Sequence, residues 1–171
     1  MKILFLDFDG VLNTRMYQTH CLSVGEPPYD AHGALFDPVA VGNLKKIIDS
    51  VPGLRIVVAS SWKVEGLGSL RRMWADRKLP GSIFDKTPDL LSSDFLSADL
   101  SDPDVMNQLE GRSKAAEIRA WLEVHAAKDC RYAIQDDVPF FPKEVEGHYV
   151  HVNPVIGITE EDVEKTIYIL Q

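Results

Sequence analysis

Apolar residues occur along this chain in blocks that have the lengths of strands and helices. Short runs dominated by apolar residues are typical of strands buried on both faces of a sheet. Four such runs span residues 3–6, 56–59, 132–134 and 149–152, and residues 82–84 give a weaker fifth candidate. The pattern therefore predicts four or five strands distributed over the whole chain.

Between these runs, apolar residues recur at helical spacing. We predict helices that begin at Asp37-Pro38, cover residues 64–78 and 113–127, and follow Thr159 near the end. Aspartate and threonine cap helix N-termini, and proline is favoured in the first turn. Because strands and helices alternate, the expected fold is α/β: a three-layer, Rossmann-like parallel sheet with helices on both faces.

Two stretches do not fit this alternation. Residues 14–36 are rich in glycine, proline and polar side chains, and residues 85–111 are rich in serine, aspartate and leucine. Within the second, Ser101-Asp102-Pro103-Asp104 resembles the start of a short helix. We expect one domain over residues 1–171, with these two stretches as small insertions over one end of the sheet.

Composition narrows the class of protein. The 171 residues are 45% hydrophobic and include 26 acidic and 18 basic side chains, for a net charge of −8. This composition excludes a disordered chain and a disulfide scaffold, and the charge argues against a protein that coats nucleic acid. No apolar run is long enough to span a membrane. With two distant cysteines and no signal-peptide pattern, we expect a cytoplasmic protein.

The first candidate for chemistry is a pair of acids at the end of the first strand. Asp7 and Asp9 leave this strand separated by one residue, and Gly10 permits a sharp exit of the backbone. Ligands of open α/β sheets bind beyond the carboxyl ends of the strands. Two carboxylates placed there repel each other unless a proton or a cation intervenes, and oxygen ligands suit Mg²⁺.

Three further elements fall at strand ends or helix starts. Ser60 and Ser61 follow the second strand, and Asp136-Asp137 follow residues 132–134. Lys114 is expected at the start of the helix over 113–127, where a cation is mildly unfavourable and therefore suggests another role. Acid, hydroxyl, cation and acid together are what phosphoryl transfer requires. No glycine-rich loop of the nucleoside-triphosphatase type is present.

These elements resemble the four motifs of the haloacid dehalogenase (HAD) superfamily of phosphohydrolases. Asp7-Phe8-Asp9-Gly10-Val11 is similar to the first motif, Ser60 to the second, Lys114 to the third and Asp136-Asp137 to the fourth. The nearer likeness is to a small-cap branch, the phosphatase-like domains associated with RNA-repair proteins. Its basis is the set of segments 9–13, 60–63, 117–118, 121–122 and 157–159.

The resemblance implies a mechanism. Asp7 would be the nucleophile that forms an aspartyl-phosphate, and Asp9 would be the general acid and then the general base. Ser60 would donate a hydrogen bond to the phosphate, and Lys114 would neutralise its charge. The insertion over residues 14–36 follows the first motif, where caps arise in this superfamily, and is short enough to be a flap rather than a lid domain.

The resemblance also implies the ligands. Mg²⁺ would bind Asp7, the backbone carbonyl of Asp9, and Asp136, with Asp137 close by or acting through water. Gly10, Ser61 and Lys63 would complete the substrate-binding residues. Lys63 stands where this branch has arginine, so it lacks the bidentate fork of a guanidinium group.

The substrate is less defined than the reaction. A thinly covered site suggests a phosphate that projects from a larger molecule, such as a nucleic-acid or protein end, although a small phosphate ester also fits. Residues 54–80 carry six basic and two acidic side chains. Four of the basic residues form the cluster Arg71, Arg72, Arg77 and Lys78. This basic segment could hold an anionic substrate.

Two other functions share parts of the pattern. A receiver-like regulatory domain also places acids, a hydroxyl and a lysine on a parallel sheet, but its acids follow a different order. A catalytically silent interaction module would keep the fold while losing Asp9 or the metal acids. Turnover of a generic phosphate ester with Mg²⁺ separates a phosphatase from both.

Overall fold

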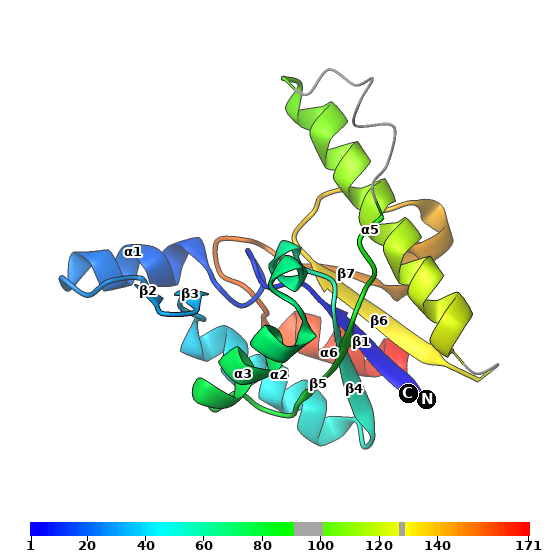
Figure 1. Cartoon of the computed structure of the whole chain (residues 1–171), viewed down its shortest axis with the longest axis horizontal. Coiled ribbons are helices and arrows are strands. Elements are labelled where there is room, and N and C mark those ends of the chain that lie inside the picture. Colours follow the sequence, from blue (N-terminus) through cyan, green and yellow to red (C-terminus); the bar gives the residue numbers. More distant parts are fainter. Residues whose placement is uncertain (91–100, 127–128) are drawn as a thin grey trace.

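A five-stranded parallel sheet forms the centre of the protein, as the computed structural model shows for residues 1–90, 101–126 and 129–171. The strands are β1 (Lys2–Leu6), β4 (Leu54–Val58), β5 (Ile83–Lys86), β6 (Arg131–Asp136) and β7 (Tyr149–His151). Their order across the sheet is β5-β4-β1-β6-β7 (Figure 1). All strands therefore end at the same edge, and the predicted parallel α/β sheet is confirmed.

Two apolar layers enclose this sheet. The central strand β1 sends Leu4 and Leu6 into one layer and Ile3 and Phe5 into the other, and all four are fully buried. The layer on the Leu4 side is built by α2 (Pro38–Ser50) and α6 (Glu160–Leu170), together with α3 (Leu67–Asp76) beside β5. The opposite layer is built by α5 (Pro103–His125) and the 3-10 helix η2 (Lys143–His148). This alternation explains why the strands are continuous apolar runs.

Residues 14–36 contain more regular structure than the sequence pattern indicates. They form α1 (Arg15–Ser23) and an antiparallel hairpin of β2 (Tyr29–Asp30) and β3 (Gly33–Ala34). Both extend to one side of the sheet (Figure 1). Cys21 is the buried residue of α1, so the helix lacks the apolar stripe by which it could be predicted. Its start is fixed instead by Thr14, which accepts from Tyr17 N and donates to Asp37 Oδ2.

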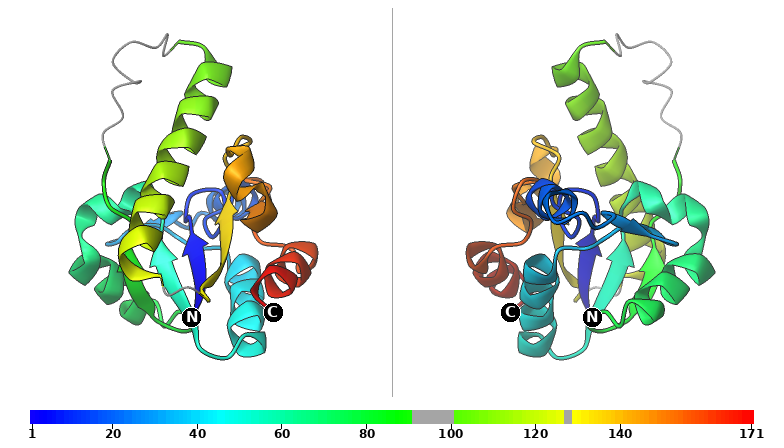
Figure 2. Two further views of the ribbon diagram at one scale, coloured as in Figure 1. Left: turned by 90° about the vertical axis from the view of Figure 1, so that its right-hand side faces the viewer. Right: turned by 90° about the vertical axis from the view of Figure 1, so that its left-hand side faces the viewer.

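The helix predicted over residues 113–127 is wrong at its start. It is continuous with the short helix expected near residue 101, so that α5 begins at Pro103 with Asp102 as its cap. Its first half projects beyond the carboxyl edge of the sheet (Figure 2), where solvent exposure removes the apolar periodicity. Lys114 therefore lies inside a helix, and the argument from an unfavourable helix N-terminus does not apply. Residues 91–100 of the second insertion lie outside the described residues.

The helix predicted over residues 64–78 is two helices. The 3-10 helix η1 (Ser61–Glu65) leads into α3, and Gly66 separates them with a φ of 86°. Ser60 caps η1, so β4 is followed at once by a tight turn. Among the described residues, no helix combines the length and apolar character needed to cross a membrane.

Candidate active site

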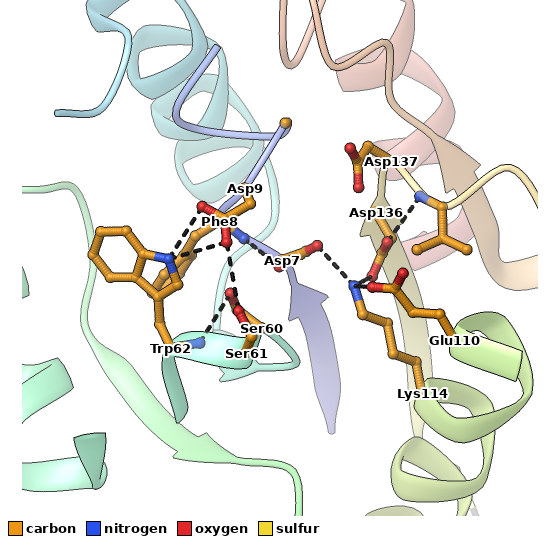
Figure 3. Close-up of polar contacts among 12 residues, drawn as sticks. Asp7, Phe8, Asp9, Ser60, Ser61, Trp62, Glu110, Lys114, Asp136 and Asp137 are labelled. Atoms are coloured by element: carbon orange, nitrogen blue, oxygen red, sulfur yellow. Dashed lines mark hydrogen bonds and ion pairs between the residues drawn. The ribbon is translucent and has the colours of Figure 1, made fainter. Parts of the chain in front are cut away.

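Three carboxylates meet at the carboxyl edge of the sheet. Asp7 directly follows β1, while Asp136 ends β6 and Asp137 follows it. The two strands are neighbours, and the backbone N–H of Asp7 extends their ladder by donating to Gln135 O at 3.0 Å. One oxygen from each carboxylate lies within 4.8 Å of the others (Figure 3). Sheet geometry thus brings together residues about 130 positions apart, as expected at strand ends.

Lys114 joins two of these carboxylates. Its Nζ donates at 2.8 Å to Asp7 Oδ2 and at 2.8 Å to Asp136 Oδ2, and Glu110 Oε1 lies 3.5 Å away. The helix reaches this position because Gly111, one turn earlier, has no side chain: a Cβ there would lie 1.8 Å from Phe140 O. The close approach of α5 to the loop after Asp137 therefore directs the ammonium group into the acid cluster.

Burial and neighbouring charges shift the pKa of each of the three groups around Asp7. Burial and the charge of Asp7 raise the pKa of Asp136 well above its usual range, against the opposing effect of Lys114. Burial and Asp7 also raise the pKa of Asp137 to about 6. Burial alone would lower the pKa of Lys114, but the charges of Asp136 and Asp7 outweigh it and raise that pKa. Burial first, and the charge of Asp7 second, therefore disfavour ionisation of Asp136 and Asp137. A divalent cation bound between the carboxylates would favour their ionised forms.

Gly10 has a steric role in the same cluster. Its φ is +71°, and a Cβ at this position would lie 2.3 Å from Asp137 Oδ2 and 2.9 Å from a Pro154 side-chain carbon. Its backbone N–H donates to Asn13 O at 3.0 Å. Any larger residue would both strain the turn and displace the Asp137 carboxylate.

Asp9 is held apart from the acid cluster. Its exposed carboxylate accepts from Asn13 Nδ2 at 2.6 Å and from Trp62 Nε1, which lies 3.1 Å from both oxygens. Ser61 Oγ lies 3.5 Å from Asp9 Oδ2. Figure 3 shows this group on the opposite side of Asp7 from Lys114. The side chain of Asp9 is thus free of the other three carboxylates and fixed in direction by its neighbours.

The protein-family comparison agrees with this geometry. Residues 3–163 match the family model described as the HAD domain in Swiss Army Knife RNA repair proteins. The chain belongs to this family. No curated protein and no solved structure matches it. The expected HAD resemblance and its RNA-repair branch are therefore confirmed, and the fold is that of a HAD-type phosphohydrolase.

The two serines of this HAD domain occupy different environments. Ser60 is buried, and its Oγ accepts from Trp62 N at 3.4 Å, whereas Ser61 is exposed and directs its hydroxyl to Asp9. Both follow β4 at the edge that holds Asp7, because Ala59 N donates to Leu6 O at 2.9 Å. The role of Ser60 as a phosphate donor stays a prediction, and the hydroxyl of Ser61 contacts Asp9.

Lys63 does not join the acid cluster. Its buried ammonium group pairs with Glu117 of α5 and donates to Thr87 Oγ1 at 3.2 Å and Pro88 O at 3.0 Å. The second oxygen of Glu117 accepts from Leu90 N at 3.2 Å. Lys63 thus connects η1, the chain after β5 and α5, and a contact with substrate would require these bonds to break.

The basic segment over residues 54–80 is also partly used within the protein. Arg71 donates to the carbonyls of Ile83 and Phe84, while Arg77 forms a bidentate pair with Asp30 of the hairpin. These two arginines therefore hold β5 and the hairpin in place. The basic surface expected from the sequence is therefore reduced to the remaining cations, which include Arg72 and Lys78.

Two residues near Asp9 were not predicted in their observed role. From the sequence alone, Trp62 is expected to be a core or groove-lining residue, and Asn13 could form a hydrogen bond near the site. Both donate to Asp9. The signal for Asn13 was its position in the turn after Asp9, but nothing in the sequence indicates that an indole 53 positions away points to the same carboxylate.

Proposed function

We propose that this HAD domain is a Mg²⁺-dependent phosphatase that hydrolyses phosphate monoesters through an aspartyl-phosphate on Asp7. The observation that carries the proposal is the division of the site into two parts. Asp7 and Asp136 lie buried beside the partly buried Lys114 and Asp137, whereas Asp9 stands outside this cluster with its carboxylate exposed. A nucleophile held ionised and a separate acid able to cycle a proton are the two requirements of this chemistry.

The residues present fit a magnesium ion. The three carboxylates offer oxygen ligands only, which Mg²⁺ prefers. With the acids ionised and Lys114 charged, the cluster has a net charge of about −2, which would repel a phosphate dianion. Asp7, Asp136 and Asp137 would hold the ion, with the backbone carbonyl of Asp9 as a further ligand. Bound there, Mg²⁺ would offset the charge of the cluster and of the phosphoryl oxygens.

The first step transfers the phosphoryl group to the enzyme. A carboxylate oxygen of Asp7 attacks phosphorus as the bond to the leaving oxygen breaks. The electron pair of that bond goes to the leaving oxygen, which takes the proton of the Asp9 carboxylic acid. Lys114 and the hydroxyl of Ser60 stabilise the charge on the non-reacting phosphoryl oxygens.

The second step returns the enzyme to its starting state. The Asp9 carboxylate, now deprotonated, accepts a proton from a water molecule, and the oxygen of that water attacks phosphorus. The bond between Asp7 and phosphorus breaks, which releases inorganic phosphate and restores the Asp7 carboxylate. The donors that surround Asp9 keep its carboxylate facing the same reacting centre in both steps.

The substrate we propose is a phosphate that projects from a larger molecule, such as a nucleic-acid or protein end. Among the described residues, the elements that cover the site are small: α1 with its hairpin on one side and the projecting half of α5 on another (Figures 1 and 2). We also propose a cytoplasmic location, because both cysteines are free thiols, which suits a reducing compartment.

Phosphate release from a generic ester, with MgCl₂ or with EDTA, tests this function. We expect many turnovers with Mg²⁺ and nearly none with EDTA, and a phosphorylated enzyme after acid quenching. Phosphorylation that stops at one equivalent would instead identify a receiver-like domain. If the protein shows no turnover and no covalent labelling, it is a silent interaction module.

A further inference from the structure

The position of a general acid reveals the side on which the leaving group departs. The acid must lie within hydrogen-bond distance of the leaving oxygen, so the rest of the leaving group extends from that point. Asp9 does not face the acid cluster but contacts Trp62 and Ser61 of η1. The leaving group therefore departs toward η1 and away from Lys114.

A cavity adjoins the two residues of η1 that contact Asp9. It has a volume of about 640 Å³ and lies between η1, α3 and the turn of the β2–β3 hairpin. Its wall includes Ser61 and Trp62, the same two residues that contact the Asp9 carboxylate. Cavities of a few hundred Å³ hold small organic ligands in many proteins.

The cavity has an apolar wall and a polar margin. Trp62, Val64, Leu70 and Met73 supply apolar surface, and Leu70 and Met73 belong to the buried core. Arg72, Ser69 and Glu65 supply polar groups at the same cavity. His32 also lines it, but its Nε2 contacts Asp76 Oδ2 at 2.9 Å. An aromatic group with polar edges matches such a wall better than a short polyol does.

The shape of this wall is fixed by its neighbours. Gly33 of the hairpin approaches Trp62 so closely that a Cβ would lie 3.0 Å from the indole ring. The indole ring of Trp62 also packs against the rings of Phe8 and Phe36, and its centroid lies 5.7 Å from the centroid of each. The Arg77–Asp30 pair fastens the hairpin to α3. The wall is therefore preformed rather than assembled by the ligand.

We propose that this cavity binds the leaving group of the substrate and selects an alcohol with an aromatic body over a short polar alcohol. The inference rests on the proposed phosphatase function and adds the chemical class of the leaving group. The bond changes are those of the first step: phosphorus passes to Asp7, and the departing alcohol takes its proton from Asp9 while its ring occupies the cavity.

Two phosphate esters with matched chemistry test the cavity. Ethyl phosphate and naphthylethyl phosphate both release a primary alcohol, so they require similar protonation by Asp9 and differ in the aromatic group. We expect kcat/KM to be about tenfold or more higher for the naphthylethyl ester, from the apolar area it buries. Equal kcat/KM values would overturn the inference while leaving the phosphatase function intact.

A variant that fills the cavity gives the second arm of the test. Val64 is 73% exposed at the cavity margin, so Val64→Trp adds bulk there without disturbing the core. It should lower kcat/KM for the naphthylethyl ester far more than for ethyl phosphate, and so remove the preference. Val124→Trp, at a similarly exposed position of α5, is the matched control and should keep the preference.

The outcomes separate the two claims. A preference that survives in Val64→Trp would show that the aromatic group binds elsewhere and would overturn the cavity assignment. Failure of the unmodified protein to hydrolyse either ester with Mg²⁺ would overturn the phosphatase function itself. Thermal melting of both variants checks that the fold is retained.

Discussion

The indole N–H of Trp62 lies 3.1 Å from each carboxylate oxygen of Asp9, although the two residues are 53 positions apart. This contact fixes the direction of the one acid that stands outside the carboxylate cluster. Trp62 is in turn packed against Phe8, Phe36 and the hairpin. We therefore regard it as a positioning residue for Asp9.

Replacing Trp62 by phenylalanine should slow the steps that need proton transfer. Trp62→Phe keeps a ring in the aromatic cluster but removes the hydrogen bond to Asp9. We expect kcat for an alkyl phosphate to fall about ten- to a hundredfold. The loss should be smaller for nitrophenyl phosphate, whose leaving group needs little protonation. Steady-state kinetics with both esters measure the difference.

Trp121→Phe is the matched control, because that tryptophan lies in the opposite core layer and donates to Asp85. It should lower the melting temperature without changing the ratio of rates for the two esters. An equal loss on both esters in Trp62→Phe would indicate a structural role for this residue alone.

Replacing the proposed nucleophile should abolish covalent labelling. Asp7→Asn keeps the size of the side chain and can still accept from Phe8 N, but its amide is a poor nucleophile. We expect turnover to fall by about 10³-fold or more and phosphoenzyme to be absent after acid quenching. Circular dichroism should show an unchanged fold. A phosphoenzyme in this variant would remove Asp7 from the role.

Replacing Asp9 should separate the two chemical steps. Asp9→Asn keeps an oxygen that can accept from Trp62 or Asn13 but cannot cycle a proton. With nitrophenyl phosphate we expect a burst of nitrophenol, followed by hydrolysis of the phosphoenzyme slowed about 10²- to 10⁴-fold. Rapid-quench kinetics and intact mass measure both. Unchanged steady-state turnover would exclude the proton-transfer role.

The acid cluster predicts how pH governs metal binding. The pKa of Asp137 is raised to about 6, above its value of 3.8 in a model peptide. Without metal, the folded state therefore holds a proton more tightly than the unfolded chain does. The contribution of this group to the free energy of unfolding declines as the pH rises from 3.8 to about 6. Mg²⁺ takes the place of the proton, so stabilisation by Mg²⁺ should grow over the same window.

Thermal melting in Mg²⁺ and in EDTA measures this effect. The increase in melting temperature should be small near about pH 5 and large near about pH 8, because only the ionised cluster binds the ion well. Asp137→Asn should weaken the pH dependence. An increase that is the same at both pH values, or no increase at either, would argue against metal binding by these carboxylates.

The strands and the acid cluster could be predicted because each depends on local pattern and on one rule of sheet geometry. Buried strands such as β1 are continuous apolar runs, and acids that follow them must meet at the carboxyl edge of a parallel sheet. The proximity of Asp7, Asp136 and Asp137 could therefore be predicted without knowledge of side-chain packing. The structure brings these residues together with Lys114, although the helix that carries Lys114 starts earlier than predicted.

The rest depended on contacts between distant residues. Helix α1 has too little apolar surface to show a pattern, and its hairpin is held by the pair Arg77–Asp30. The direction of the Asp9 side chain depends on Trp62, and the location of the Lys63 ammonium depends on Glu117. Such contacts are set by packing in three dimensions, and they produce no regular spacing of residues from which they could be predicted.

The Lys63–Glu117 pair gives the last prediction, which separates a structural lysine from a substrate-binding one. Both side chains are at least nine-tenths buried, so removing one leaves an uncompensated charge in the interior. We expect Lys63→Met to lower the free energy of unfolding by about 3 kcal/mol. The double variant Lys63→Met/Glu117→Leu removes both charges and should recover much of that loss. Urea denaturation measures the stabilities, and kcat/KM of the double variant should stay near that of the unmodified protein. A double variant that is stable but has lost affinity for phosphate esters would instead place the Lys63 ammonium on the substrate.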